Sequence, residues 1–190
     1  CKTHKLIYEW KPPNNSSITV AATNPSQVLV ALGGGNLVFL NIEATTLVVA
    51  ATAKLDQEVA CLDISPIGDN ATSARYAAVG MWIDMSVRVL ALPTLTESLR
   101  HVLKSDGSAV GDVISRSVMF HVFGKQTHLL VGLGDGRLFN FYFNCNNDTN
   151  VTLSNLKRVT LGIQPIGLKR FRARDKEYVF AASDRPTVVY

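Results

Sequence analysis

Apolar and polar positions along this chain form short runs that are separated by turn residues. The pattern is clearest in residues 129–143, LLVGLGDGRLFNFYF, where Gly134-Asp135-Gly136 divides an apolar half from an aromatic half. Two strand-like runs joined by residues that tolerate positive φ are typical of a β-hairpin. The same pattern predicts hairpins at residues 28–42, 77–92 and 179–190.

The four predicted hairpins recur at a regular spacing. When Ala31, Gly80, Gly132 and Ala182 are aligned, the period is roughly 50 residues, which is typical of propeller blades and other repeats. A further strand is predicted on each side of most hairpins, and the last unit ends without its closing strand. These additional strands are predicted at residues 6–10, 16–23, 45–54, 59–64, 95–103, 117–123, 155–161 and 165–171, with a loop at 144–150 and a turn at 172–176.

This arrangement predicts an all-β fold. A four-stranded sheet with two apolar faces is not stable alone, so it stacks on copies of itself, and closure into a ring removes the free edges. We therefore expect residues 1–190 to form a single partial domain. It is an incomplete β-propeller of about four blades of four-stranded antiparallel sheet, with units at about 16–54, 58–103, 115–161 and 164–190. A β-sandwich, which also has short strands and frequent turns, is the alternative.

Composition narrows the class of protein. Of the 190 residues, 47% are hydrophobic and 18% charged, which indicates a folded domain and not a disordered tail. No run reaches the roughly 18 apolar residues of a membrane span, so no membrane partner is expected. The chain begins at Cys1 without Met, and we interpret it as a fragment of a longer multi-propeller protein. Its net charge of +4 permits an acidic partner without requiring one.

Cysteines and asparagines point to different compartments. Three cysteines, an odd number without close pairs, favour a reduced intracellular protein. Four Asn-x-Ser/Thr triplets, beginning at Asn15, Asn70, Asn147 and Asn150, are the alternative signal, for a glycosylated secreted protein. Such triplets arise by chance in loops of this composition, and we prefer the intracellular interpretation.

Catalytic and metal-binding patterns are missing from the sequence. The four histidines are scattered, and there is no Cys-x-x-Cys pair, Gly-x-Ser-x-Gly elbow or phosphate-binding Gly-x-x-x-x-Gly-Lys. The glycines at 33–35 lie where a hairpin turn is predicted. One aspartate per unit near a strand end is typical of a turn residue or cap, as for Asp63, Asp84, Asp135 and Asp184. We expect no enzyme, no metal and no cofactor.

Two exposed features are candidates for binding. Trp82 lies in the turn of the second hairpin, where it either packs on a neighbouring blade or serves as an interface anchor. A basic run with Phe171 interleaved could contact phosphates, although a solvated turn is preferred because the overall charge is low. This run consists of Lys169, Arg170, Arg172, Arg174 and Lys176. Arg116, just before a predicted strand, is typical of a surface residue or a local ion pair.

Several segments together resemble one known family. They are EVACLDI at 58–64, residues 80–90, LGDG at 133–136, TLG with QP at 160–165, and SDRPTV at 183–188. In this order they resemble the family of the large subunit of the damage-specific DNA-binding protein. Its superfamily includes the large cleavage-and-polyadenylation subunit and a splicing-factor 3b subunit. The resemblance implies that the chain is part of the middle one of three seven-bladed propellers.

The resemblance also implies a function. In that family the middle propeller docks the cullin-4 scaffold of a ubiquitin ligase, the other two hold substrate receptors, and DNA is a further partner of the complex. The Trp of its Gly-x-Trp-x-Asp-x-Ser segment and the Arg of its Pro-Arg-Ser segment map onto Trp82 and Arg116, with Ser115 here in place of Pro. A non-catalytic adaptor in DNA repair and ubiquitination, in the nucleus and cytoplasm, is therefore expected. The alternatives are a scaffold of a splicing or polyadenylation complex and, more weakly, direct nucleic-acid binding.

Overall fold

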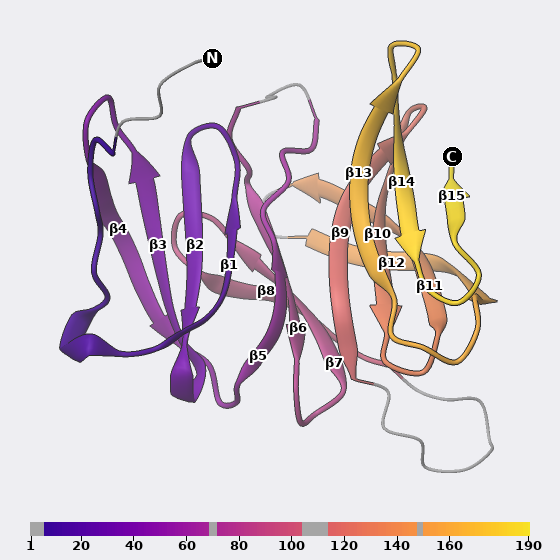
Figure 1. Cartoon of the computed structure of the whole chain (residues 1–190), viewed down its shortest axis with the longest axis horizontal. Coiled ribbons are helices and arrows are strands. Elements are labelled where there is room, and N and C mark those ends of the chain that lie inside the picture. Colours follow the sequence, from indigo (N-terminus) through magenta and orange to yellow (C-terminus); the bar gives the residue numbers. More distant parts are fainter. Residues whose placement is uncertain (1–5, 69–71, 104–113, 148–149) are drawn as a thin grey trace.

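The computed structural model describes residues 6–68, 72–103, 114–147 and 150–190. In these ranges the regular structure is β-strand apart from two short 3-10 turns, η1 (Pro13–Asn15) and η2 (Gly33–Gly35). The strands form four separate antiparallel sheets, which we call blades 1 to 4, each with its strands in chain order (Figure 1). This is the predicted all-β class of a partial propeller.

Three blades have four strands and the fourth has three. Blade 1 contains β1 (Ile18–Thr23), β2 (Gln27–Leu32), β3 (Asn36–Ile42) and β4 (Leu47–Lys54). Blade 2 contains β5 (Val59–Asp63), β6 (Tyr76–Met81), β7 (Ser86–Ala91) and β8 (Thr96–Val102). Blade 3 contains β9 (Ser115–Phe123), β10 (Gln126–Leu133), β11 (Arg137–Asn147) and β12 (Asn150–Thr160). Blade 4 contains β13 (Gly167–Ala173), β14 (Lys176–Ala182) and β15 (Thr187–Val189).

Neighbouring blades pack face to face, and a hydrophobic core lies between each pair. Leu29 and Phe39 of blade 1 pack with Val79 and Met81 of blade 2. Phe120 and Phe143 of blade 3 pack with Tyr76 of blade 2, and Leu130 of blade 3 packs with Val179 of blade 4. Alternate side chains of one strand thus enter different cores, which is why the middle strands are apolar on both faces.

The first strands of the blades come closest to one another, as β1, β5, β9 and β13 show in Figure 1. Glycine permits this approach at two of the aligned positions. A Cβ at Gly80 would lie 2.5 Å from Cys61 Sγ and would also overlap Ser115 Oγ of the next blade. A Cβ at Gly132 would lie 2.6 Å from Ser117 Oγ and 2.9 Å from Ile166 Cβ. A side chain at Gly80 or Gly132 would therefore push neighbouring blades apart.

Three predictions about elements were wrong. Residues 6–10 form no strand; Trp10 instead packs on the outer face of blade 1, against the cluster of Val30, Leu32, Val38 and Leu40. The asparagine-rich loop predicted at 144–150 is largely strand, because β11 and β12 continue with pairs such as Asn144↔Thr152. The turn predicted at 172–176 shrinks to residues 174 and 175, both with positive φ.

Candidate functional site

Trp82 and Arg116 lie against each other although 34 positions separate them. Trp82 follows β6 of blade 2, and Arg116 is the second residue of β9 of blade 3. The Arg116 guanidinium carbon lies 5.2 Å from the centre of the Trp82 ring, a cation–π arrangement. Trp82 remains 38% exposed, and the next residue, Ile83, is 69% exposed. One cation and two large apolar side chains therefore face solvent from adjacent blades, which is the composition of an interface anchor.

The loop that carries Trp82 is fixed at several points. The Trp82 N–H donates to the carbonyl of Glu58 at 3.1 Å. The Asp84 carboxylate accepts hydrogen bonds from the Ser86 N–H at 3.1 Å and the Ser86 hydroxyl at 2.6 Å. Its other oxygen accepts from Arg88 at 2.6 Å. Burial raises the pKa of Asp84, but the hydrogen bonds from Ser86 and Arg88 outweigh it and leave the pKa lowered. Asp84 is therefore the predicted turn residue, held as a carboxylate.

Arg88 is a buried cation in the middle of an apolar strand. It is 1% exposed, and besides Asp84 it donates to Asp56, at 2.5 Å, in the β4–β5 connection. The hydrogen bond from Arg88 lowers the pKa of Asp56. Glu97 and Arg100 of β8 complete the network. Glu97 lies 3.4 Å from Arg88 and also pairs with Arg100 at 3.2 Å. The network joins blade 1 to the loop of Trp82. Sequence reasoning missed Arg88, although one charge within SVRVLA was a usable signal.

Arg116 emerges from a buried strand start. Ser115, which replaces the family's usual Pro, is fully buried and opens β9, and its carbonyl accepts from the Cys61 thiol at 3.6 Å. One residue earlier, the Ile114 carbonyl accepts a hydrogen bond from the Gly134 N–H at 2.9 Å. These contacts fix the backbone at Arg116 without a proline.

The basic run does not form one stripe. Strand alternation places Arg170 and Arg172 on the same face of β13 as buried Leu168, and Lys169 on the other face. Arg172 pairs with Asp175 at 3.3 Å, while Arg174 lies in the turn and Lys176 begins β14. The five residues are therefore near in sequence but point in several directions.

Arg170 has internal partners. It donates to the carbonyl of Phe120 in β9 at 3.2 Å and to the Ser65 hydroxyl of blade 2. Ser65 and the Phe120 N–H in turn donate to the Asp63 carboxylate, at 2.6 and 2.7 Å. Burial raises the pKa of Asp63. Asp63 and Arg170 thus link the first strands of blades 2, 3 and 4. This is a structural role that neither the predicted phosphate contact nor the preferred solvated turn included.

Among the described residues there is no group of three or more His, Cys, Asp or Glu placed to hold a metal ion. His121 and His128, which flank a turn, instead pack on Phe123, with ring centres 4.4 and 5.0 Å away. Cys1 and His4 lie outside the described residues. No helix in the described part of the chain is both long and apolar enough to cross a membrane.

Comparison with known proteins identifies similar sequences over the whole chain. A family model described as the RSE1/DDB1/CPSF1 second beta-propeller matches residues 1–190. DNA damage-binding protein 1a of Arabidopsis thaliana is 46% identical over 188 residues, which are 99% of this chain and 16% of that protein. DNA damage-binding protein 1 of Oryza sativa subsp. japonica is 41% identical over 190 residues, 100% of this chain and 17% of that protein. The chain therefore spans about a sixth of the length of these relatives.

Proposed function

Because this chain belongs to the RSE1/DDB1/CPSF1 second β-propeller family, we propose that it is a non-catalytic scaffold that docks a cullin-4 protein. Trp82, Ile83 and Arg116 form the docking surface. In this proposal the substrate receptors of the ligase bind other propellers of the full-length protein, which acts in the nucleus and cytoplasm. The family resemblance supports both the cullin partner and the choice of Trp82 and Arg116, and the contact between these two side chains supports treating them as one surface.

The observation that supports this surface is the stacking of Arg116 on Trp82. The two residues were singled out from separate segments, and they form one exposed unit across two blades. Arg116 covers one side of the Trp82 ring, which leaves the rest of the ring and Ile83 free to bury against a partner. An Arg guanidinium already held on an aromatic ring is also oriented for a charge-assisted hydrogen bond to a carboxylate.

Trp82 and Arg116 should together contribute a large part of the binding free energy. A Trp that acts as a true hot spot costs about 2 kcal/mol or more when truncated, which corresponds to roughly 30-fold in Kd. Arg116→Ala removes both its own contact and the support of the Trp82 ring. The effects of the two substitutions should therefore not add: the double variant should bind better than the product of the two single losses implies.

The test measures the affinity of the full-length protein for the N-terminal region of cullin-4 by calorimetry, for the parent, Trp82→Ala, Arg116→Ala and the double variant. Tyr8→Ala is the matched control, because Tyr8 is also a partly exposed aromatic residue but lies on blade 1. Unchanged circular dichroism confirms that the variants fold.

Two outcomes would count against the proposal. If the Trp82→Ala protein binds cullin as tightly as the parent, the docking surface lies elsewhere. If the parent protein does not bind cullin at all, the alternative of a subunit scaffold in an RNA-processing complex becomes the better one.

A further inference from the structure

The last residues of β12 have the charge pattern of a protein-kinase substrate. Residues 156–162 read LKRVTLG, so Thr160 is preceded by Lys157 and Arg158 and followed by Leu161. Kinases that select basic substrates bind the segment around the acceptor hydroxyl in an extended form. They have acidic pockets for basic residues two and three positions before the acceptor and an apolar site for the residue after it. The sequence around Thr160 meets each of these requirements.

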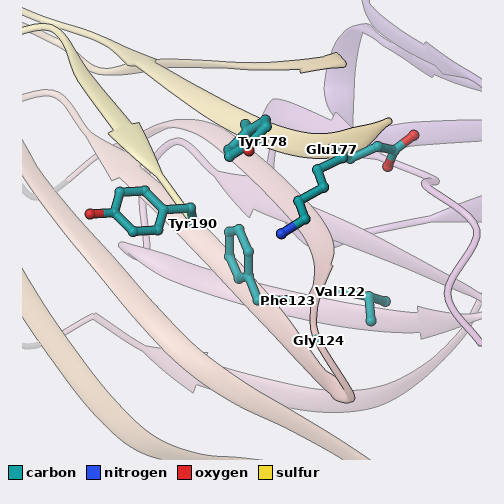
Figure 2. A pocket seen from close by; sticks show the side chains of 7 residues that line it. Val122, Phe123, Gly124, Glu177, Tyr178 and Tyr190 are labelled. Atoms are coloured by element: carbon teal, nitrogen blue, oxygen red, sulfur yellow. The ribbon is translucent and has the colours of Figure 1, made fainter. Parts of the chain in front are cut away.

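The structure holds this segment extended at the outer edge of blade 3. In the described part of the chain β12 is the last strand of its sheet and pairs with β11 on one side. Residues 157–160 are all exposed. Thr160 lies at the same end of blade 3 as Arg116, and at the opposite end from the pocket in Figure 2, whose lining includes Phe123. An enzyme can therefore approach Thr160 from the outer rim of the blade.

Two arginines lie on the same face of blade 3 as Thr160. The strand register pairs Arg137 with Thr160, and Phe139 with Arg158. Directly opposite residues project from the same face with Cβ atoms about 5 Å apart, and residues two apart along one strand share a face as well. Both guanidinium groups accordingly lie over the Phe139 ring, Arg137 at 5.9 Å and Arg158 at 5.2 Å from its centre. A phosphate on Thr160 would have one arginine across the strand pair and the other along its own strand.

Arg137 has a weaker anionic partner in the unmodified protein. The Asp135 carboxylate accepts a hydrogen bond from Arg137 Nε at 2.6 Å and lies 2.5 Å from its Nη2. A phosphothreonine carries about −1.5 to −2 charges near pH 7 and has three acceptor oxygens, whereas a carboxylate carries one charge. A phosphate on Thr160 should therefore draw Arg137 away from Asp135 and loosen the turn at residues 134–136.

The apolar residue after Thr160 becomes accessible through a local opening. Leu161 is 5% exposed, packs in the core between blades 3 and 4, and donates its N–H to the Gly136 carbonyl at 2.8 Å. Exposing a buried leucine corresponds to about 10- to 150-fold in the opening equilibrium. Unfolding a whole domain of ordinary stability corresponds to more than roughly 1,000-fold. The end of β12 should therefore open far more often than the whole domain unfolds.

We propose that Thr160 is a phosphorylation site for a Ser/Thr kinase that selects basic substrates. Thr160 Oγ1 attacks the γ-phosphorus of ATP, and the bond from that phosphorus to the β–γ bridging oxygen breaks. ADP leaves, and the hydroxyl proton passes to the catalytic carboxylate of the kinase. The new phosphate then binds Arg137 and Arg158. Three strand spacings, about 14 Å, separate β12 from β9, so the site is distinct from Arg116 and does not depend on the proposed cullin docking.

The test incubates the full-length protein with MgATP and the catalytic subunit of cAMP-dependent protein kinase, and follows the peptide that contains residue 160 by mass spectrometry. The parent should be phosphorylated at Thr160 about 10 to 150 times more slowly than a synthetic peptide of residues 156–162, because the strand end must open. Thr160→Val should give no phosphate on that peptide, and Arg158→Gln should slow the reaction about tenfold or more. Lys54→Gln, which changes an exposed Lys of blade 1, and Trp82→Ala should react as the parent does.

Hydrogen exchange of the phosphorylated protein tests where the phosphate binds. Phosphorylation should lower the protection of residues 133–137 in the parent, because Asp135 loses Arg137, and should change it little in Arg137→Gln, which keeps the residues that the kinase recognises. Unchanged protection in the phosphorylated parent would exclude the contact with Arg137. The proposal is overturned if the synthetic peptide is not a substrate. It is also overturned if Thr160 is phosphorylated only after the protein has been unfolded in urea.

Discussion

Replacing Arg88 with Met tests whether the buried ion network holds the loop of Trp82. Met keeps the length of the side chain but leaves Asp84, whose side chain is 20% exposed, without its guanidinium partner. Removing one member of a buried ion pair costs about 3–5 kcal/mol. The lower end applies here, because Asp56 is 51% exposed and Glu97 35% exposed, so water can solvate both again. A loss of about 3 kcal/mol corresponds to roughly 150-fold in the local opening equilibrium.

The assay is hydrogen exchange of the full-length protein, followed by mass spectrometry of peptides from β6, β7 and the loop between them. Protection there should fall by about two orders of magnitude in the Arg88→Met protein, while β13 and β14 of blade 4 keep theirs. Arg88→Lys should give an intermediate loss, because one ammonium group cannot bind two carboxylates at the geometry seen for Asp84 and Asp56. Arg100→Met is the control, since Arg100 belongs to the same network but its side chain is 42% exposed.

The pH dependence of hydrogen-exchange protection is a second test of the same network. The pKa values of Asp84 and Asp56 are lowered, so their contribution to stability is present above the ordinary value of 3.8 and is lost as the pH falls through the lowered values. The parent should therefore lose protection below about pH 4 more steeply than Arg88→Met does. Equal protection of the parent and Arg88→Met proteins at pH 7 would mean that the network contributes nothing to the stability of the loop.

Three further predictions concern the contacts between blades. Gly80→Ala should destabilise blade 2 by about 1–3 kcal/mol, because the new methyl group would lie 2.5 Å from Cys61 Sγ. Gly167→Ala is the control and should be nearly neutral in the same hydrogen-exchange experiment, because the space around Gly167 is open. Iodoacetamide at pH 8 should modify exposed Cys145 but not Cys61 in the native protein, as mass spectrometry can show, because burial raises the pKa of the Cys61 thiol to about 12. Because the pKa of Asp63 is raised, the parent protein should lose free energy of unfolding as the pH rises through that pKa. Asp63→Asn should remove this pH dependence. If the variant and the parent show the same pH profile, the pKa of Asp63 is not the cause.

Local signals explain why the strands were predictable. Alternation of apolar residues and turn chemistry at Gly134-Asp135-Gly136 act over a few residues, so they specify hairpins before any long-range contact forms. The same local logic went wrong at residues 144–150. Asparagines favour turns when considered alone, but here cross-strand pairing such as Asn144↔Thr152 keeps them extended.

Some features of the candidate site follow from local sequence signals, and others depend on long-range contacts. The repeated hairpin with two apolar faces is encoded locally, and so is the position of Trp82 as an aromatic residue in a turn. Long-range packing is what stacks Arg116 on Trp82, buries Arg88 among carboxylates and brings Arg170 to the carbonyl of Phe120. The physical reason is that period and turn chemistry are properties of neighbouring residues. Which side chains meet across two blades depends instead on how the sheets rotate and pack, and close approach at Gly80 and Gly132 sets that packing.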